Sequence, residues 1–160
     1  MSDKKTTTKK PSGNRRKSRE LVLKGLYQHL LSPKELRLIV REMADEPDFS
    51  HADEGYFRSL LEGVYAQLPE LDERITKFLD RAIAELSPIE HAILLISAYE
   101  LIFDVSIPYR VAINEGVELA KLYGGTDGHK YVNAVLNGEI DMILNTLANF
   151  GFPRRYVKTR

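Results

Sequence analysis

The 160-residue sequence contains no cysteine and no long apolar run. Without cysteine the chain has no disulfide, thiolate nucleophile, zinc ribbon or iron–sulfur cluster, which agrees with a reducing compartment. The most apolar stretch, Ala92 to Phe103, is only twelve residues long and includes Glu100, so it is too short to cross a membrane. No signal peptide is recognisable. We therefore expect a soluble, cytoplasmic protein without a membrane partner.

The sequence also lacks the usual signatures of metal and cofactor sites. Its four histidines, at positions 29, 51, 91 and 129, show no His-x-x-x-His pairing. Its acids are scattered along helical patterns, and no pair stands out as a general acid and base. The glycine-rich turn at residues 124–128 lacks the Gly-Lys-Ser/Thr of a phosphate-binding loop. We expect no metal and no cofactor, and the residues alone single out no catalytic centre.

The net charge of zero conceals an uneven distribution. Residues 1–20 carry a charge of +6 and residues 154–160 carry +4, so residues 21–153 carry −10. Lysine and arginine clusters neutralise phosphates and release counterions, so basic ends on an acidic body suggest a polyanion such as RNA as partner. The alternative is that the basic ends only increase solubility.

Length and composition are those of one compact domain with extensions. Hydrophobic residues make up 43% of the chain and charged residues 29%, which is ordinary for a globular protein. Residues 1–14 are polar and basic and are expected to be disordered, residues 15–149 to form the folded domain, and residues 150–160 to form a basic tail.

Apolar residues recur at helical spacing through the folded part, and no comparable stretch alternates with period two. The pattern predicts an all-α domain of about seven helices, near residues 15–31, 33–46, 52–68, 69–83, 88–103, 108–123 and 126–149. The stretch from Ala92 to Phe103 is apolar nearly all round and is expected at the centre of the fold. Glycines 124 and 125 are expected to end a helix through a positive φ.

Two similar motifs predict helix starts. Ser32-Pro33-Lys34-Glu35 and Ser87-Pro88-Ile89-Glu90 both place serine at a cap, proline at the first helical position and glutamate at the third. The helix predicted near residues 15–31 has no glutamate at its third position. Arg15, Arg16, Lys17 and Arg19 occupy its first turns, where cations oppose the helix dipole, so this end is expected to fray unless an anion meets it.

Lys130 and Tyr131 follow the glycine-rich turn directly. A cation beside an aromatic ring can bind a phosphate while an unpaired base stacks on the ring. This requires an exposed ring, since a tyrosine at helical spacing is more often part of the core.

The chain resembles the bacterial transcription antitermination factor family NusB. The resemblance covers about 135 residues. It is carried by Arg15-Arg16-Lys17-Ser18-Arg19-Glu20, Leu26-Tyr27, Tyr56-Phe57-Arg58-Ser59-Leu60-Leu61, Tyr99-Glu100-Leu101, Ile107-Pro108-Tyr109-Arg110-Val111-Ala112-Ile113-Asn114-Glu115, Val117-Glu118-Leu119-Ala120-Lys121 and His129-Lys130-Tyr131-Val132-Asn133.

The resemblance implies two packed helical subdomains and a non-enzymatic adapter. Such a protein binds single-stranded boxA RNA with the ribosomal protein NusE and helps RNA polymerase, in an antitermination complex, to resist premature termination in ribosomal RNA operons. The resemblance assigns RNA contacts to Arg15, Arg16, Lys17, Arg19, Asp127, Lys130 and Tyr131, and NusE contacts to Tyr27 and Glu90. The basic first turns and Tyr131 are expected to form one continuous RNA-binding surface.

The sequence departs from the family in small ways, and other functions stay open. Lys17 replaces an arginine and loses its planar fork, while Tyr131 replaces a phenylalanine and adds a hydroxyl. One alternative is a helical adapter that binds only proteins. Another is the NusB-like RNA-binding domain of an RNA methyltransferase. The sequence leaves open whether the protein is a monomer or a homodimer.

Overall fold

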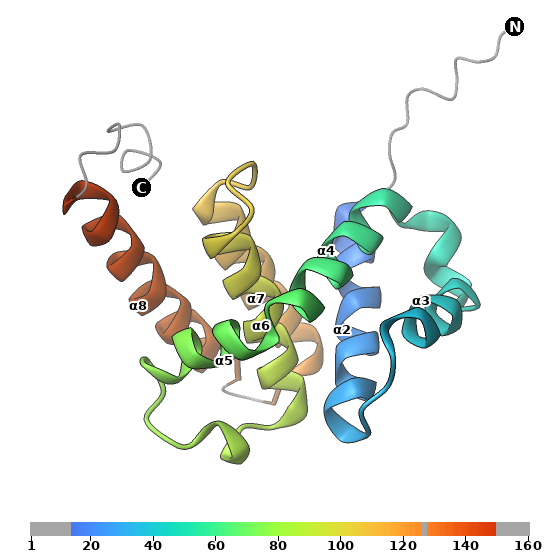
Figure 1. Ribbon diagram of the computed structural model, residues 1–160, viewed down its shortest axis with the longest axis horizontal. Coiled ribbons are helices and arrows are strands. Elements are labelled where there is room, and N and C mark those ends of the chain that lie inside the picture. The colour runs from blue at the N-terminus through green and yellow to red at the C-terminus, as the bar shows by residue number, and fades with distance from the viewer. Residues whose placement is uncertain (1–13, 126–127, 150–160) are drawn as a thin grey trace, which may run out of the picture. The chain divides into compact units, whose positions relative to one another are not determined.

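The computed structural model describes residues 14–125 and 128–149, with residues 140 and 143–149 described by their backbone only. The chain forms two compact units, divided between Ala66 and Gln67. The described part contains seven α-helices and two short 3-10 helices, and no β-strand (Figure 1). The expected all-α fold is therefore confirmed, with two compact units as the resemblance implies.

Unit 1 contains α2 (Arg15–Leu31), α3 (Leu36–Ala44), the 3-10 helix η1 (Pro47–His51) and α4 (Glu54–Ala66). Its core is made of side chains that are at most 1% exposed, among them Leu26, Ile39, Phe57 and Leu60. Helices α2 and α3 approach closely at Gly25, where an added Cβ would lie 2.5 Å from Cγ2 of Ile39. This close approach explains a glycine in the middle of a helix.

The start of α2 is tied to the segment that precedes α4. The Asn14 side chain accepts a hydrogen bond from the Lys17 amide at 3.1 Å and so caps the helix. The Asn14 amide donates to the His51 carbonyl at 3.1 Å, and the Asn14 carbonyl accepts from the Asp53 amide at 3.3 Å. These bonds bring the acids of residues 48–53 beside the basic first turns of α2.

The motif at Ser32 does not cap a helix, so that prediction is wrong. Ser32 instead ends α2, because its amide donates to the Gln28 carbonyl, and α3 begins only at Leu36. The Lys34 amide donates to Nδ1 of His29 at 3.1 Å, so one of the two amides that a serine N-cap at position 32 could bind is already satisfied.

Unit 2 contains α5 (Leu68–Thr76), the 3-10 helix η2 (Ile83–Glu85), α6 (Pro88–Ile102), α7 (Tyr109–Tyr123) and α8 (Gly128–Asn149). Every residue of α6 from Ala92 to Ala98 is buried. Helices α5, α7 and α8 all contact α6, so the expected central helix is confirmed for this unit.

The second serine motif does start a helix. The Ser87 side chain accepts a hydrogen bond from the Glu90 amide at 3.1 Å, with Pro88 in the first turn of α6. Gly124 ends α7 with φ of −84°, so the expected positive φ is wrong. The residue is small for a steric reason instead, because an added Cβ would lie 2.7 Å from the Ala120 carbonyl oxygen.

A largely buried ion pair joins α5 and α8 in unit 2. Nη2 of Arg74 on α5 is 2.6 Å from Oε2 of Glu139 on α8, and the Glu139 side chain is only 2% exposed. Burial raises the pKa of the Glu139 carboxyl above its ordinary value, against the attraction of Arg74.

Candidate nucleic-acid interface

The first candidate surface is the basic start of α2 in unit 1. Arg15 and Arg16 are exposed, and Lys17 is partly exposed. The Arg15 guanidinium lies over the Tyr56 ring, 4.3 Å from the centroid, and its Nε is 3.8 Å from an Asp53 carboxylate oxygen. An exposed guanidinium held in place in this way remains open to a phosphate.

Acids of the same unit meet the cations of this helix start. The Lys17 ammonium donates to Asp48 at 3.3 Å and lies 3.5 Å from Glu20. The hydrogen bond to Asp48, followed by the charge of Glu20, raises the pKa of Lys17, so the ammonium stays protonated. The anion expected to steady this helix end is therefore supplied partly by the chain itself.

Arg19 differs from the other three cations because it is only 4% exposed. Its guanidinium lies 5.4 Å from the Tyr56 ring centroid, the ring that Arg15 also contacts. A side chain this deeply buried is placed to fix the ring and the helix start rather than to meet phosphates.

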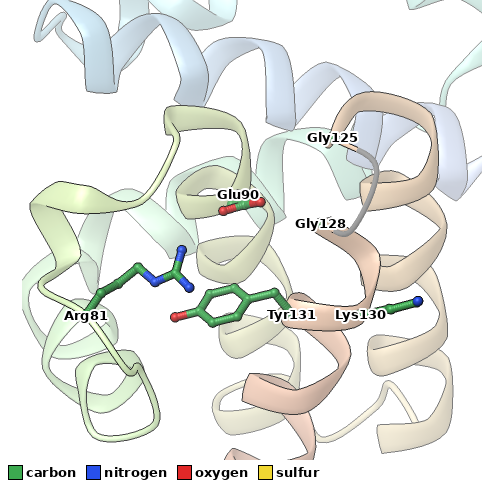
Figure 2. Close-up of a pocket in the computed structure, with 6 residues that line it drawn as sticks. All are labelled: Arg81, Glu90, Gly125, Gly128, Lys130 and Tyr131. Carbon is green, nitrogen blue, oxygen red and sulfur yellow. The ribbon is translucent and has the colours of Figure 1, made fainter.

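The second candidate surface is a pocket in unit 2, at the start of α8. Its volume is about 480 Å³. We call it the ring pocket, and it is lined by Arg81, Glu90, Gly125, Gly128, Lys130 and Tyr131 (Figure 2). Lys130 is exposed, and Figure 2 shows its side chain directed away from the Tyr131 ring. Asp127 lies outside the described residues.

Tyr131 is part of a three-residue cluster with Asp80 and Arg81, which lie between α5 and η2. Its hydroxyl donates to Oδ1 of Asp80 at 3.2 Å, and the Arg81 guanidinium lies 4.4 Å from its ring centroid. Asp80 also accepts from Nε of Arg81 at 2.7 Å. That hydrogen bond lowers the pKa of the Asp80 carboxyl, while partial burial raises the pKa of the Tyr131 phenol. The Tyr131 side chain is half-buried at the pocket, and the Arg81 guanidinium lies over its ring.

The two residues assigned to NusE lie in different units. Tyr27 is half-buried on α2, in unit 1. Glu90 is half-buried in the first turn of α6 and lines the ring pocket with Tyr131. Its Oε2 is so close to Gly128 that an added Cβ there would lie 3.2 Å away. Within unit 2, a residue assigned to a protein partner and two residues assigned to RNA thus share one pocket.

Reasoning from the sequence missed Asp80 and Arg81. They are adjacent residues about fifty positions before Tyr131. The apolar pattern predicts a helix near residues 69–83, but α5 ends at Thr76, so that part of the prediction is wrong and both residues lie outside the α-helices. Their only sequence signal is an acid beside an arginine, which is too common to single out a site.

In the part of the chain that the structure describes, no group of three or more histidines or acids could hold a metal ion. Among the same residues, no helix has the length and apolar character needed to span a bilayer.

The described part of the chain is helical and carries basic side chains beside aromatic rings at two helix starts, which is typical of a nucleic-acid-binding surface. The model of the NusB family matches residues 16–141. The chain belongs to the NusB family.

Curated relatives and solved structures agree with this assignment. The chain is 68% identical over 128 residues to the transcription antitermination protein NusB of Methylobacillus flagellatus, covering 80% of this chain and 83% of the relative. It is 52% identical over 126 residues to the NusB of Thiobacillus denitrificans, covering 79% and 87%. The structure of T. maritima NusB has a TM-score of 0.73 at 29% identity, covering 82% of this chain and 93% of that one. A structure described as antitermination factors NusB and NusE in complex with dsRNA has a TM-score of 0.74 at 26% identity, covering 80% and 96%.

Proposed function

We propose that this protein is a transcription antitermination factor that binds boxA RNA together with NusE. In this role it helps RNA polymerase to resist premature termination in ribosomal RNA operons. The observation that carries the proposal is the 68% identity over 128 residues to a curated antitermination protein. That relative is named as an antitermination protein and not as a methyltransferase, which favours this role over the domain of an RNA-modifying enzyme.

The residues divide the work of RNA binding. Arg15, Arg16 and Lys17 contact phosphates and supply affinity that depends on salt. Tyr131 supplies a ring on which a base of single-stranded RNA stacks. Lys130 and Asp127, one and four residues before it in the sequence, supply further RNA contacts. Arg19 acts as a positioning residue, because its buried guanidinium packs against the Tyr56 ring.

The protein acts as a non-catalytic adapter in the cytoplasm and needs no cofactor. Tyr27 and Glu90 form the contacts with NusE. Support for an acidic contact comes from charge, since residues 21–153 carry −10 and can attract a basic ribosomal protein.

Salt titration of RNA binding tests the phosphate contacts. Replacing Arg15, Arg16 and Lys17 with alanine should flatten the slope of log K against log salt by roughly 0.7 for each phosphate of a single strand that is no longer neutralised. Arg37→Ala is a matched control, because Arg37 is an exposed arginine that pairs with an acid of its own segment, Glu35. A triple variant with the slope of the control would refute the assignment.

A gel-shift titration with and without NusE tests the adapter role. The expected result is that boxA RNA is shifted and that a scrambled RNA of equal length is shifted less, with the preference strongest when NusE is present. Binding of NusE without any preference for boxA RNA would instead indicate an adapter that binds only proteins.

A further inference from the structure

We propose that Arg81 is an additional RNA-contact residue, held against the Tyr131 ring by Asp80 so that it can bind the phosphate next to a stacked base. The inference rests on the proposed function and names a residue of the ring pocket that the sequence pattern does not reveal.

Geometry is the first support for this role. Asp80 accepts hydrogen bonds from Nε and Nη2 of Arg81, at 2.7 and 3.4 Å, and from the Tyr131 hydroxyl at 3.2 Å. One carboxylate therefore fixes both the guanidinium and the ring. The side chains of Asp80 and Arg81 are 70% and 40% exposed, so the cluster is accessible to a ligand.

The chemistry of the guanidinium is the second support. A guanidinium has five N–H groups in a planar fork, so the two atoms that Asp80 engages leave donors for a phosphate. Its central carbon already lies over the Tyr131 ring, 4.4 Å from the centroid. Stacking of a base on an aromatic ring is stronger than an exposed cation–π contact, so an incoming base can displace the guanidinium from the ring. Asp80 then keeps the displaced guanidinium at the rim of the pocket, beside the nucleotide's phosphate.

Unit 1 contains a similar arrangement at a residue already assigned to RNA. Arg15 lies 4.3 Å from the Tyr56 ring centroid and 3.8 Å from Asp53, and Asp53 accepts from the Tyr56 amide at 3.0 Å. In both units a carboxylate and a tyrosine ring hold an exposed arginine in a defined position. Arg81 thus has a physical environment similar to that of Arg15, with a shorter contact to its carboxylate.

The test compares Arg81→Ala with Arg37→Ala in a salt titration of boxA RNA binding, with NusE present and absent. Both variants remove one exposed arginine that is paired through Nε with a nearby acid, at 2.7 Å in one and 2.8 Å in the other. We expect Arg81→Ala to bind about tenfold more weakly and to reduce the salt slope by about 0.7, the effect of leaving one phosphate of a single strand without its cation. The control should match the wild type.

Two further variants define the contact. Arg81→Lys should retain the salt slope but bind more weakly than the wild type, because it keeps the charge and loses the fork. In a double-mutant cycle with Tyr131→Ala, the two reductions in affinity should not add, because the residues form one site. Thermal melting of each variant verifies the fold.

Each outcome has a distinct meaning. An Arg81→Ala variant that binds RNA as well as the control, or more tightly, would overturn the proposal. The guanidinium would then only hold the segment between α5 and η2 in place. A variant that loses only NusE binding would also overturn it, since Arg81 would then be a protein contact. Failure of the wild type to bind boxA RNA would instead overturn the proposed function itself.

Discussion

Gly116 provides the sharpest test of the packing in unit 2. It lies in the middle of α7 and is buried between α6 and α8. An added Cβ would overlap Oγ of Ser97 and would lie 3.1 Å from Cδ1 of Leu136 and 3.3 Å from Cβ of Ser97. The Ser97 hydroxyl can rotate away, but its Cβ is fixed by α6. The three helices must therefore move slightly apart to admit even one methyl group.

The size of the effect follows from two opposing terms. Forcing a methyl group into a packed core costs roughly 1 to 3 kcal/mol. Replacing glycine by alanine inside a helix returns up to about 1 kcal/mol. We therefore expect Gly116→Ala to lower the free energy of unfolding by about 1 kcal/mol, and the bulkier Gly116→Val to lower it by roughly 3 kcal/mol or more.

Urea denaturation of these variants and of a control measures whether the helices of unit 2 pack as closely at Gly116 as the structure shows. Gly55→Ala is the matched control, because an added Cβ on this α4 glycine would meet only Oδ1 of Asp53, at an ordinary 3.6 Å. It should be neutral or stabilising by up to about 1 kcal/mol. Adding Ser97→Ala to Gly116→Ala should recover part of the stability by removing the overlapping hydroxyl. If Gly116→Ala stabilised the protein as much as Gly55→Ala, the close approach of these helices would be wrong.

Three other expectations concern charge and capping. Burial raises the pKa of Glu139, so the folded state holds a proton that the unfolded state releases, and this favours folding at low pH. This contribution should be fully present below the ordinary pKa of 4.5 and fall as pH rises through the raised value, and Glu139→Gln should remove that pH dependence in denaturation curves. Asp48→Asn should strengthen RNA binding by about two- to fivefold at fixed salt, because it removes one of the two acids that compete with phosphate for the Lys17 ammonium, leaving Glu20; unchanged binding would argue against a role for Lys17. Ser87→Ala should lower the free energy of unfolding by about 1 kcal/mol, whereas Ser32→Ala should change it by less than about 0.5 kcal/mol, and equal effects would contradict the different roles of the two motifs.

The two serine motifs show which parts of the fold the sequence can predict. Helical spacing of apolar residues predicted the number and order of the helices, because each helix must bury a continuous stripe, but it extended the helix near residues 69–83 beyond Thr76, where α5 ends. The caps were less certain. Ser87 and Ser32 precede similar residues, yet only Ser87 caps a helix, because the segment after Ser32 bonds to groups at the end of α2 instead. Such competition depends on the three-dimensional neighbours and has no local signal.

The candidate site was predictable to the same degree. Lys130 and Tyr131 were found because they are adjacent in the sequence, and the helix start because its charges are consecutive. Arg81 could not be found, because packing in unit 2 brings it to Tyr131 across fifty positions. Burial of Arg19 was equally hidden, since a count of charges does not distinguish an exposed guanidinium from one that packs against a ring.

The acids beside the candidate RNA contacts explain how a chain of zero net charge can bind a polyanion. Free arginine and lysine side chains lose much rotamer freedom when a phosphate fixes them. In unit 1 Asp53 and the Tyr56 ring hold Arg15, and in unit 2 Asp80 holds Arg81, so much of that freedom is already removed during folding. The carboxylates weaken the attraction for phosphate, but they also lower the entropic cost of binding it. A surface of ordered cations can therefore gain specificity for the positions of phosphates and bases, where a larger excess of mobile charge would bind any polyanion.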